Sequence, residues 1–440
     1  MKLITSTSGR TLPLHFPVCF LLLLLTQVSC RDRKKTGTET AATSTQEIPP
    51  LYERRGELAS AAEWPRTKAK VTELNDKIRK DPNDIKPRLQ MAMIYLSEAR
   101  ITGEHPYYYP AILTILDGVL AMDPKNFEAT TFKASVKMSQ HQFSEAKEIA
   151  EKARQINPSN AYVYGVLVDA NVELGNYDEA VDVSDKMQQL KPSLESYSRA
   201  SYLREIYGNY PSSIEAMKLA VQAGLPGSEP QCWSKNMLGH LYETTGQLTE
   251  AEEQYAGILS MRPSYAFALA GQARIDKARK KYDKALATLE KAAKIMPEFS
   301  FHEQMAEIYA LQGNQQKAQK KYAEVAGMLG EDARSGHAVD LELCKLYTKT
   351  GQLDSALVYG LNEYRKRPKN IDVNHALAWV YFNQHELKNA RQHMEVALRT
   401  GSKDPELLQQ AGAIELALGN VDQRNRLLAA ARKTNPAFTL

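Results

Sequence analysis

Residues 238–263 read LGHLYETTGQLTEAEEQYAGILSMRP, and this stretch decides the fold. Apolar residues recur at three- and four-residue spacing on both sides of Gly246, which predicts two short amphipathic helices joined by a turn. A glycine at that turn can adopt the positive φ with which helices commonly end. Pro263 ends the second helix because proline cannot continue the hydrogen-bond ladder. The stretch therefore predicts a helix–turn–helix unit.

The same unit recurs along the chain with a fixed period. Pro124, Pro158 and Pro192 are each 34 residues apart, and so are Pro263 and Pro297. Within a unit, a small residue on the first helix faces a small residue on the second, which lets the two helix axes approach closely. These pairs are Ala134 with Ala146, Gly239 with Ala251, Ala273 with Ala285, Ala306 with Ala318, and Ala378 with Ala390.

This repeated unit resembles the tetratricopeptide repeat (TPR), and the resemblance covers almost everything after residue 84. One repeat cannot bury its apolar faces alone, so stacked repeats share one continuous core. The resemblance implies an all-α fold, a right-handed α-solenoid of about ten TPR helix-turn-helix repeats. The repeats are expected at 85–126, 127–160, 161–193, 194–227, 232–265, 266–298, 299–332, 337–370, 371–404 and 405–438.

Several irregular segments interrupt the period. Residues 102–110 (TGEHPYYYP) read as an insertion between the helices of the first repeat, and its three tyrosines are expected either to cap that repeat or to form an aromatic contact site. Residues 224–231 and 330–336 read as glycine-containing joints. Cys344 occupies a small-residue position and is expected in the core, whereas Cys232 opens a helix and is expected to be partly exposed.

The first thirty residues have the features of an export signal. Lys2 and Arg10 precede an apolar run over residues 16–25, which is shorter than the roughly 20 residues that a bilayer requires but fits a signal peptide. Val28-Ser29-Cys30 resembles the end of a bacterial lipobox, although Gln27 stands where that motif usually has leucine. The resemblance implies that Cys30 is lipidated; ordinary secretion is the alternative.

The N-terminal organisation follows from this signal. Residues 1–29 are expected to be the signal peptide and residues 30–50 a lipid-anchored flexible tether, because they are polar and bury little apolar surface. Residues 51–84 are expected to form N-terminal capping helices, with a helix over residues 66–80. The expected location is the bacterial cell envelope, as an outer-membrane lipoprotein facing the periplasm or exposed on the surface.

Composition and motifs argue against most chemistry. The 440 residues carry 56 Lys and Arg against 52 Asp and Glu, a net charge of +4 that disfavours nucleic-acid binding. The sequence has no nucleotide-binding, zincin or serine-hydrolase motif. Because repeats occupy the chain, no segment remains for a catalytic domain. We therefore expect no enzymatic activity, no cofactor, no metal site and no small-molecule substrate.

The resemblance implies a concave groove lined by the first helix of each repeat. Exposed aromatic and arginine side chains on such a face are common interface anchors, although packing against the next repeat explains each of them equally well. The candidate partner-binding residues are Tyr162, Asp169, Trp233, Asn236, His240, Phe267, Arg274, His375, Trp379 and Phe382.

These observations favour a non-catalytic scaffold that binds other proteins. It would dock peptide segments or helices in the groove during envelope or secretion-system assembly, with Trp233, Phe267 and Trp379 as anchors. One alternative is a structural assembly subunit that uses its convex face or terminal repeats. A remote alternative is an enzyme with an unrecognised site.

Overall fold

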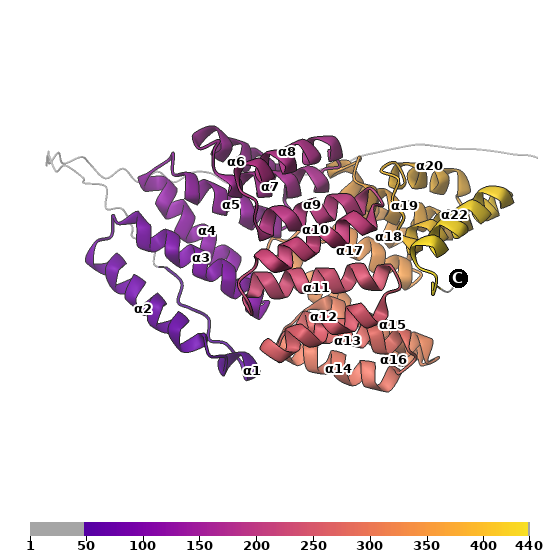
Figure 1. The fold of residues 1–440 in the computed structure, drawn as a ribbon, viewed down its shortest axis with the longest axis horizontal. Coiled ribbons are helices and arrows are strands. Elements are labelled where there is room, and N and C mark those ends of the chain that lie inside the picture. The colour runs from indigo at the N-terminus through magenta and orange to yellow at the C-terminus, as the bar shows by residue number, and fades with distance from the viewer. Residues whose placement is uncertain (1–47, 439–440) are drawn as a thin grey trace, which may run out of the picture. The chain divides into compact units, whose positions relative to one another are not determined.

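A computed structural model describes residues 48–438 of the chain, and within this range it contains 22 helices and no strand (Figure 1). The predicted all-α solenoid is confirmed. The predicted signal peptide, Cys30 and most of the predicted tether lie outside the described residues.

Two N-terminal helices precede ten consecutive helix pairs. The N-terminal helices are α1 (Gly56–Ala59) and α2 (Trp64–Lys80). The first five pairs are α3 (Ile85–Thr102) with α4 (His105–Met122), α5 (Phe127–Ser139) with α6 (Phe143–Ile156), α7 (Ala161–Glu173) with α8 (Tyr177–Leu190), α9 (Leu194–Ile206) with α10 (Tyr210–Ala223), and α11 (Glu229–Thr244) with α12 (Leu248–Met261). The last five are α13 (Ala266–Ala278) with α14 (Tyr282–Ile295), α15 (Phe299–Leu311) with α16 (Gln315–Arg334), α17 (Asp340–Lys349) with α18 (Leu353–Lys366), α19 (Ile371–Asn383) with α20 (Leu387–Ala397), and α21 (Pro405–Ala417) with α22 (Val421–Thr434).

Small residues lie where the two helices of a pair meet. Ala134 and Ala146 are fully buried, and so are Ala273 and Ala285 further along the core. Cys344 takes the same position in α17, and its burial raises the pKa of its thiol to about 12. Side chains this small leave room for the close helix contact on which each pair depends.

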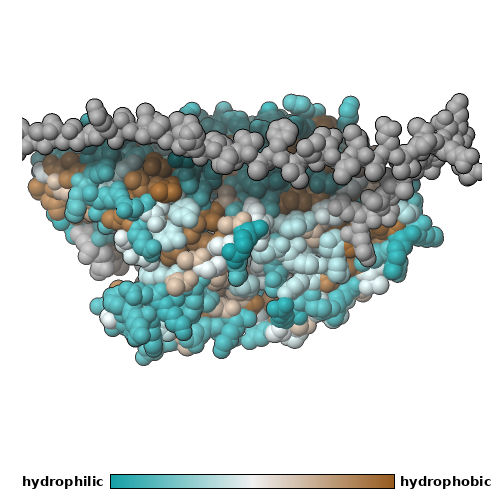
Figure 2. Space-filling model, turned by 180° about the vertical axis from the view of Figure 1, so that it is seen from behind, coloured by the Kyte–Doolittle hydropathy of each residue, from teal (hydrophilic) through white to brown (hydrophobic). Residues whose placement is uncertain are grey.

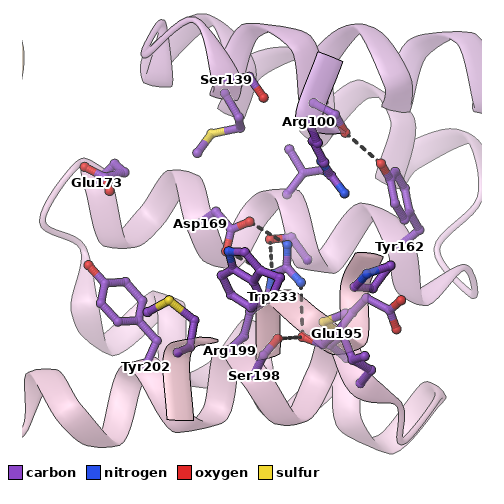
Figure 3. Close-up of a pocket in the computed structure, with 18 of the residues that line it drawn as sticks. Arg100, Ser139, Tyr162, Asp169, Glu173, Glu195, Ser198, Arg199, Tyr202 and Trp233 are labelled. Carbon is purple, nitrogen blue, oxygen red and sulfur yellow. Dashed lines mark hydrogen bonds and ion pairs between the residues drawn. The ribbon is translucent and has the colours of Figure 1, made fainter. Parts of the chain in front are cut away.

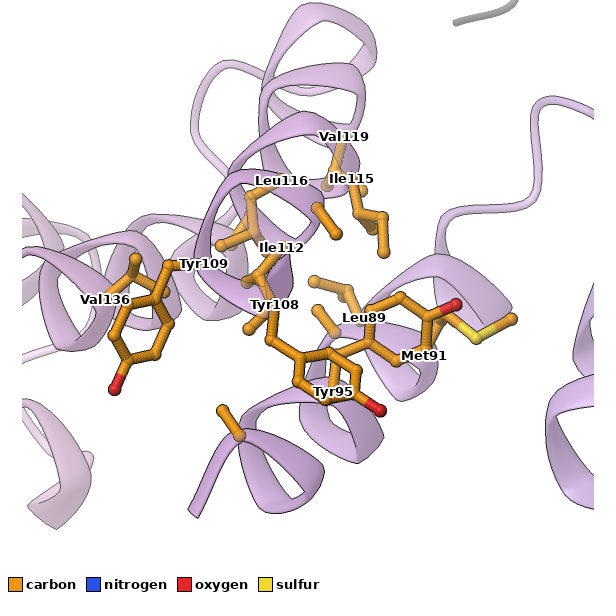
Figure 4. Close-up of a cluster of buried hydrophobic side chains, with 14 of the residues drawn as sticks. Leu89, Met91, Tyr95, Tyr108, Tyr109, Ile112, Ile115, Leu116, Val119 and Val136 are labelled. Carbon is orange, nitrogen blue, oxygen red and sulfur yellow. The ribbon is translucent and has the colours of Figure 1, made fainter. Parts of the chain in front are cut away.

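The segment that precedes α3, from residue 48 to the end of α2, packs against the apolar face of the first pair, and we call it the N-terminal cap. Tyr95 of α3 and Tyr108 of α4 meet edge to face with ring centroids 5.3 Å apart, inside a cluster of leucine and isoleucine side chains (Figure 4). The extended segment before α1 crosses this cluster, where the Tyr95 hydroxyl donates to the Pro49 carbonyl at 2.6 Å and the Tyr107 hydroxyl donates to the Pro50 carbonyl at 2.5 Å. Residues 48–50, predicted as the end of the flexible tether, are therefore packed against the first repeat.

The predicted insertion at residues 102–110 is not a loop. It lengthens both helices of the first pair, because α3 continues to Thr102 and α4 begins at His105. Pro106 is tolerated in the first turn of α4, where its missing amide proton has no helical partner. Tyr108 and Tyr109 are buried, so the aromatic run contributes to the cap rather than to an exposed contact site.

Two further expectations are wrong. Gly330 to Arg334 lie inside α16, so the second joint is shortened to residues 335–339. Cys232 is fully buried instead of partly exposed, because α11 begins earlier, at Glu229, and places the thiol in the core formed with Leu194 and Tyr210.

The array coils until later repeats touch earlier ones. The Ala338 amide donates to the Gln140 carbonyl at 3.0 Å, and Gln142 Nε2 donates to the Gly336 carbonyl at 2.9 Å. Figure 1 shows the helices near the C-terminus, coloured orange to yellow, beside the magenta helices of the first half. We call this line of contacts the seam; it joins residues 140–142 and 173–177 to residues 336–338, 367–371 and Arg399.

Arg367 forms the centre of the seam. Its side chain, 4% exposed, pairs with Glu173 across the seam and, at 2.5 Å, with Glu363 in the last turn of α18, the helix that Arg367 follows. Asn370 Nδ2 donates to the Glu173 carbonyl at 2.9 Å, and the Ile371 amide donates to the Tyr177 hydroxyl at 2.9 Å. Around Arg367, the polar groups of the two sides therefore satisfy each other.

The outer surface is mixed in character. On the face seen in Figure 2, apolar patches are separated by hydrophilic side chains. None of the helices in residues 48–438 combines the length and the apolar composition that a bilayer crossing requires.

Candidate partner-binding hollow

Helices α3, α5, α7, α9 and α11 surround a hollow of about 720 Å³ (Figure 3). This volume lies in the range of sites that hold a drug-sized ligand or a few peptide residues. Methionine and aliphatic side chains form part of the wall, among them Met138, Val166, Met187 and Met237. Aromatic, acidic and arginine side chains form the rest.

Three aromatic side chains face the hollow and remain accessible. Tyr162, Tyr202 and Trp233 are 41%, 39% and 41% exposed. They come from the first helices of three successive pairs, α7, α9 and α11. An aromatic ring on these faces offers a large apolar contact area together with a polar atom that can hydrogen-bond.

Arg199 is held in place by the chain itself. Its Nε and Nη2 donate to the two carboxylate oxygens of Asp169 at 2.9 and 2.6 Å, while Nη1 donates to the Glu195 carbonyl at 3.0 Å. A Cβ at Gly165 would lie 3.1 Å from the Arg199 guanidinium carbon, so the absence of a side chain there leaves space for the arginine. The Arg199 charge is consequently neutralised within the wall.

Two carboxylates in the wall lack such a partner. Within residues 48–438, Glu205 and Glu229 accept no side-chain hydrogen bond and form no ion pair within 4.0 Å. Burial, assisted by the charges of Asp404 and Asp372, raises the pKa of Glu205 from 4.5 to about 7. Burial also raises the pKa of Glu229, against the opposing effect of Arg100 and Arg262.

The structure brings three of the predicted binding residues to the hollow: Tyr162, Asp169 and Trp233. Phe267 instead lines a neighbouring cavity of about 450 Å³ and packs edge to face on Phe301, with ring centroids 5.6 Å apart.

The remaining predicted residues lie elsewhere along the array. Arg274 forms a bidentate ion pair with Glu243. Burial, together with the positive charge of Arg274, lowers the pKa of the neighbouring His240. Asn236 is half-buried, and its amide oxygen lacks a hydrogen-bond partner.

A third group of predicted residues lies on α19. His375 hydrogen-bonds to the Gln410 side chain at 2.9 Å, and Trp379 stacks on Phe382 with ring centroids 4.8 Å apart. None of these three residues reaches the hollow.

Sequence reasoning missed Arg199, Tyr202 and both unpaired carboxylates. Arg199 lies 34 residues before the predicted Trp233, and Tyr202 lies 34 residues before the predicted Asn236. Both could therefore have been predicted by applying the repeat period to the candidate residues of α11. Glu229 had no such signal, since α11 was expected to begin after it.

In residues 48–438 no group of three His, Cys, Asp or Glu side chains is arranged to hold a metal ion. The hollow combines exposed aromatic rings, flexible thioethers and unpaired carboxylates, which is a chemistry of binding.

Comparison with known proteins agrees with the repeats. Two family models, each described as a tetratricopeptide repeat, match residues 137–198 and 234–265. No curated protein matches the chain in sequence.

Solved structures of similar fold include a thermophilic TPR protein of Thermus thermophilus, at 20% identity and a TM-score of 0.38 over 44% of this chain and 98% of that one. A tetratricopeptide repeat protein of Parabacteroides merdae is 14% identical, with a TM-score of 0.40 over 56% of this chain and 93% of its own. The human IFIT1 dimer with PPP-AAAA is 14% identical, with a TM-score of 0.47 over 85% and 88%. The two family matches show that the chain contains tetratricopeptide repeats, and its helix pairs form an all-α solenoid.

Proposed function

We propose that this chain is a non-catalytic scaffold that captures a segment of a partner protein in the hollow. The observation that carries the proposal is the accessibility of Tyr162, Tyr202 and Trp233 within a concave space of about 720 Å³. Binding energy at protein interfaces is concentrated in such aromatic anchors when a partner covers them. TPR proteins in general bind other proteins or peptides, which agrees with this use of the hollow.

Site-specific photo-crosslinking in cells tests the proposal. A photoreactive p-benzoylphenylalanine replaces Tyr202 in the hollow or, as a control, the 57% exposed Val358 on the second helix of its pair. We expect a discrete protein adduct from position 202 and none of the same size from position 358. The same adduct from both positions, or none from position 202, contradicts capture in the hollow.

Two tryptophans provide a matched pair of variants. Trp233 lines the hollow, whereas Trp379 stacks on Phe382 outside it, and both lie on first helices of their pairs. Trp233→Ala should abolish the position-202 adduct, and Trp379→Ala should leave it unchanged.

We further propose that the chain is exported and anchored to the bacterial envelope through Cys30. The support is the charged and apolar pattern of residues 1–29 and the lipobox-like residues before Cys30. Cys30→Ser should move the protein from the membrane fraction to the soluble fraction. An unchanged membrane fraction would rule out the lipid anchor while leaving capture in the hollow untouched.

A structural assembly subunit is the second candidate. Large apolar side chains that are exposed outside the hollow favour it: Leu225, Leu311 and Val358 are 76%, 61% and 57% exposed. Adducts from position 358 alone, together with loss of assembly on deletion of residues 405–438, would favour this function over capture in the hollow.

A further inference from the structure

We infer that the segment captured in the hollow carries a lysine or arginine side chain, which lies against Trp233 and Tyr202 and pairs with Glu205 or Glu229. This inference rests on the proposed function and specifies the chemistry of its partner. It concerns an extended basic segment of another protein.

The charge of the wall is the first step. Five carboxylates line the hollow, on Asp169, Glu173, Glu195, Glu205 and Glu229, against two arginines, Arg100 and Arg199. Arg199 is neutralised by Asp169, as its two short hydrogen bonds show. Glu173 is likewise paired, with Arg367 of the seam. Glu195, Glu205 and Glu229 then remain against Arg100, so the wall retains an excess of negative charge toward the space that a ligand would occupy.

Neighbouring elements increase this excess at Glu205. Asp372 of α19 and Asp404, which caps α21, both act on Glu205 as like charges. Neither aspartate forms an ion pair within 4.0 Å among the described residues. A cation placed beside Glu205 relieves the mutual repulsion of three carboxylates, whereas an anion increases it.

The bare aromatic rings are the second, independent step. Elsewhere in the described part of the chain its own arginines cover aromatic rings: Arg399 lies 4.8 Å from the Tyr177 ring centre, and Arg367 lies 4.7 Å from that of Phe143. No Lys or Arg lies over Tyr162, Tyr202 or Trp233 among residues 48–438.

The two steps specify the same ligand. Tryptophan and tyrosine faces attract cations, and a nearby carboxylate adds a charged hydrogen-bond acceptor. The methylene stem of a lysine or arginine is apolar and can lie along Met187, Met237 and Trp233 while its charged end reaches a carboxylate. A neutral or acidic segment satisfies only the apolar part of the wall.

Defined peptide pools test this inference on the purified full chain. Fluorescein-labelled nonapeptides with randomised neutral flanks carry a fixed central lysine, arginine, norleucine or glutamate, and fluorescence anisotropy measures their binding. We expect the lysine and arginine pools to bind roughly tenfold or more tightly than the norleucine pool, with the preference reduced by added salt. The glutamate pool should bind most weakly.

Two double variants locate the effect. Glu205→Gln with Glu229→Gln should remove most of the preference for lysine over norleucine. The control variant, Glu145→Gln with Glu215→Gln, changes two carboxylates that are 48% and 70% exposed and lie outside the hollow, and it should keep the preference. Circular dichroism and thermal melting establish that each variant is folded.

The outcomes separate this inference from the proposed function. Equal binding of all pools, tighter binding of the glutamate pool, or a preference that survives the Glu205 and Glu229 changes overturns the basic-segment inference. If the position-202 adduct nevertheless forms in cells, capture in the hollow stands with a partner of different chemistry. Loss of the adduct together with absence of binding by every pool overturns both.

Discussion

The seam and the hollow are built from the same helix pairs but treat their polar groups in opposite ways. At the seam, Arg367 is 4% exposed and is paired on both sides by Glu173 and Glu363. In the hollow, Glu205 and Glu229 have no such partner and Trp233 is 41% exposed. The paired groups around Arg367 hold the coil closed, whereas the unpaired carboxylates of the hollow leave binding capacity on the inner face.

The difference comes from which part of each repeat is used. The seam is made largely by the turns between helices and between repeats, where backbone carbonyls and amides are free to bond across the coil. The hollow is made by first-helix faces, whose backbone groups are already bonded within the helix. Only side chains are available there, and they remain available to a partner.

The largest expected effect follows from breaking the seam at Arg367. Arg367→Ala leaves the Glu173 carboxylate without a cation and leaves Glu363 paired only with the half-exposed Lys366. Losing one partner of a buried ion pair costs about 3–5 kcal/mol. Urea unfolding followed by circular dichroism measures this loss. Arg391→Ala is the control, because Arg391 is itself 50% exposed in its pairs with Glu395 and Glu415, and its loss should cost under about 1 kcal/mol.

Hydrogen exchange shows where the Arg367 variant opens. The Ala338 amide, which donates to Gln140 across the seam, should exchange faster, while amides inside α13 and α14 should not. Equal stability of the two arginine variants would contradict the role given to the seam.

The next effect tests how closely the two sides of the seam approach. Gly175 has φ +76°, and a Cβ there would lie 2.3 Å from the backbone carbon of Lys369. Gly175→Ala should destabilise the fold by about 2–4 kcal/mol, from left-handed strain and overpacking together. Gly313 has φ +75° and no neighbour within 4 Å, so Gly313→Ala should lose only the strain, about 1–2 kcal/mol.

Thermal or urea unfolding of the two glycine variants gives the difference directly. Because the backbone conformation is the same at both positions, the difference isolates the contact across the seam. Equal losses would show that the two sides do not meet at Gly175.

Glu205 should make the protein less stable as the pH rises, whereas a carboxylate with a lowered pKa makes a protein more stable. The raised pKa of Glu205, about 7 against an ordinary 4.5, means that between these pH values the folded state keeps a proton that the unfolded state has lost. Stability should therefore fall as the pH rises from about 5 to 7. The groups acting on Glu205 are Asp372 and Asp404, and its own charge raises the pKa of Tyr202 and Tyr210 in turn.

Glu205→Gln should remove this pH dependence and stabilise the protein at pH 8 by about 1–2 kcal/mol, a range reduced for solvent screening in the hollow. Free energies of unfolding at pH 5, 6, 7 and 8 measure it. The exposed Glu215→Gln serves as the control and should change neither the slope nor the stability by a measurable amount. A variant that is less stable than the parent at pH 8 would show that Glu205 has a stabilising partner.

The sequence predicted the solenoid because the signals that build a helix pair are local. Proline ends the second helix, small residues such as Ala134 and Ala146 mark the contact, and the 34-residue period repeats both. The segment at 102–110 was misjudged because its prolines suggest a loop, although Pro106 is well accommodated at the start of α4. Local patterns predict each helix pair, but they do not show whether extra residues form a loop or lengthen the helices.

The seam was beyond such reasoning. It joins residues nearly two hundred positions apart, such as Glu173 and Arg367, and their meeting depends on small rotations summed over many repeats. The hollow was partly accessible, since Tyr162, Asp169 and Trp233 were found by their place on the first helices. Glu205 could not be predicted. Its raised pKa arises in part from Asp372 and Asp404, which come near it only because the array coils.

The smallest expected effect concerns Trp233, and it distinguishes a binding surface from a core. Trp233 is 41% exposed in the hollow, whereas Trp64, at the start of α2, is 2% exposed. Trp233→Ala should reduce the free energy of unfolding by less than about 1 kcal/mol, while Trp64→Ala should cost about 3–5 kcal/mol. Urea unfolding of both variants makes the comparison within one chain and one residue type.

Trp233→Ala should also abolish the crosslink from position 202. If the variant loses binding but keeps its stability, Trp233 serves binding and not folding. A loss comparable to that of Trp64→Ala would mean that Trp233 holds the fold together, and its exposure would then no longer support a partner site.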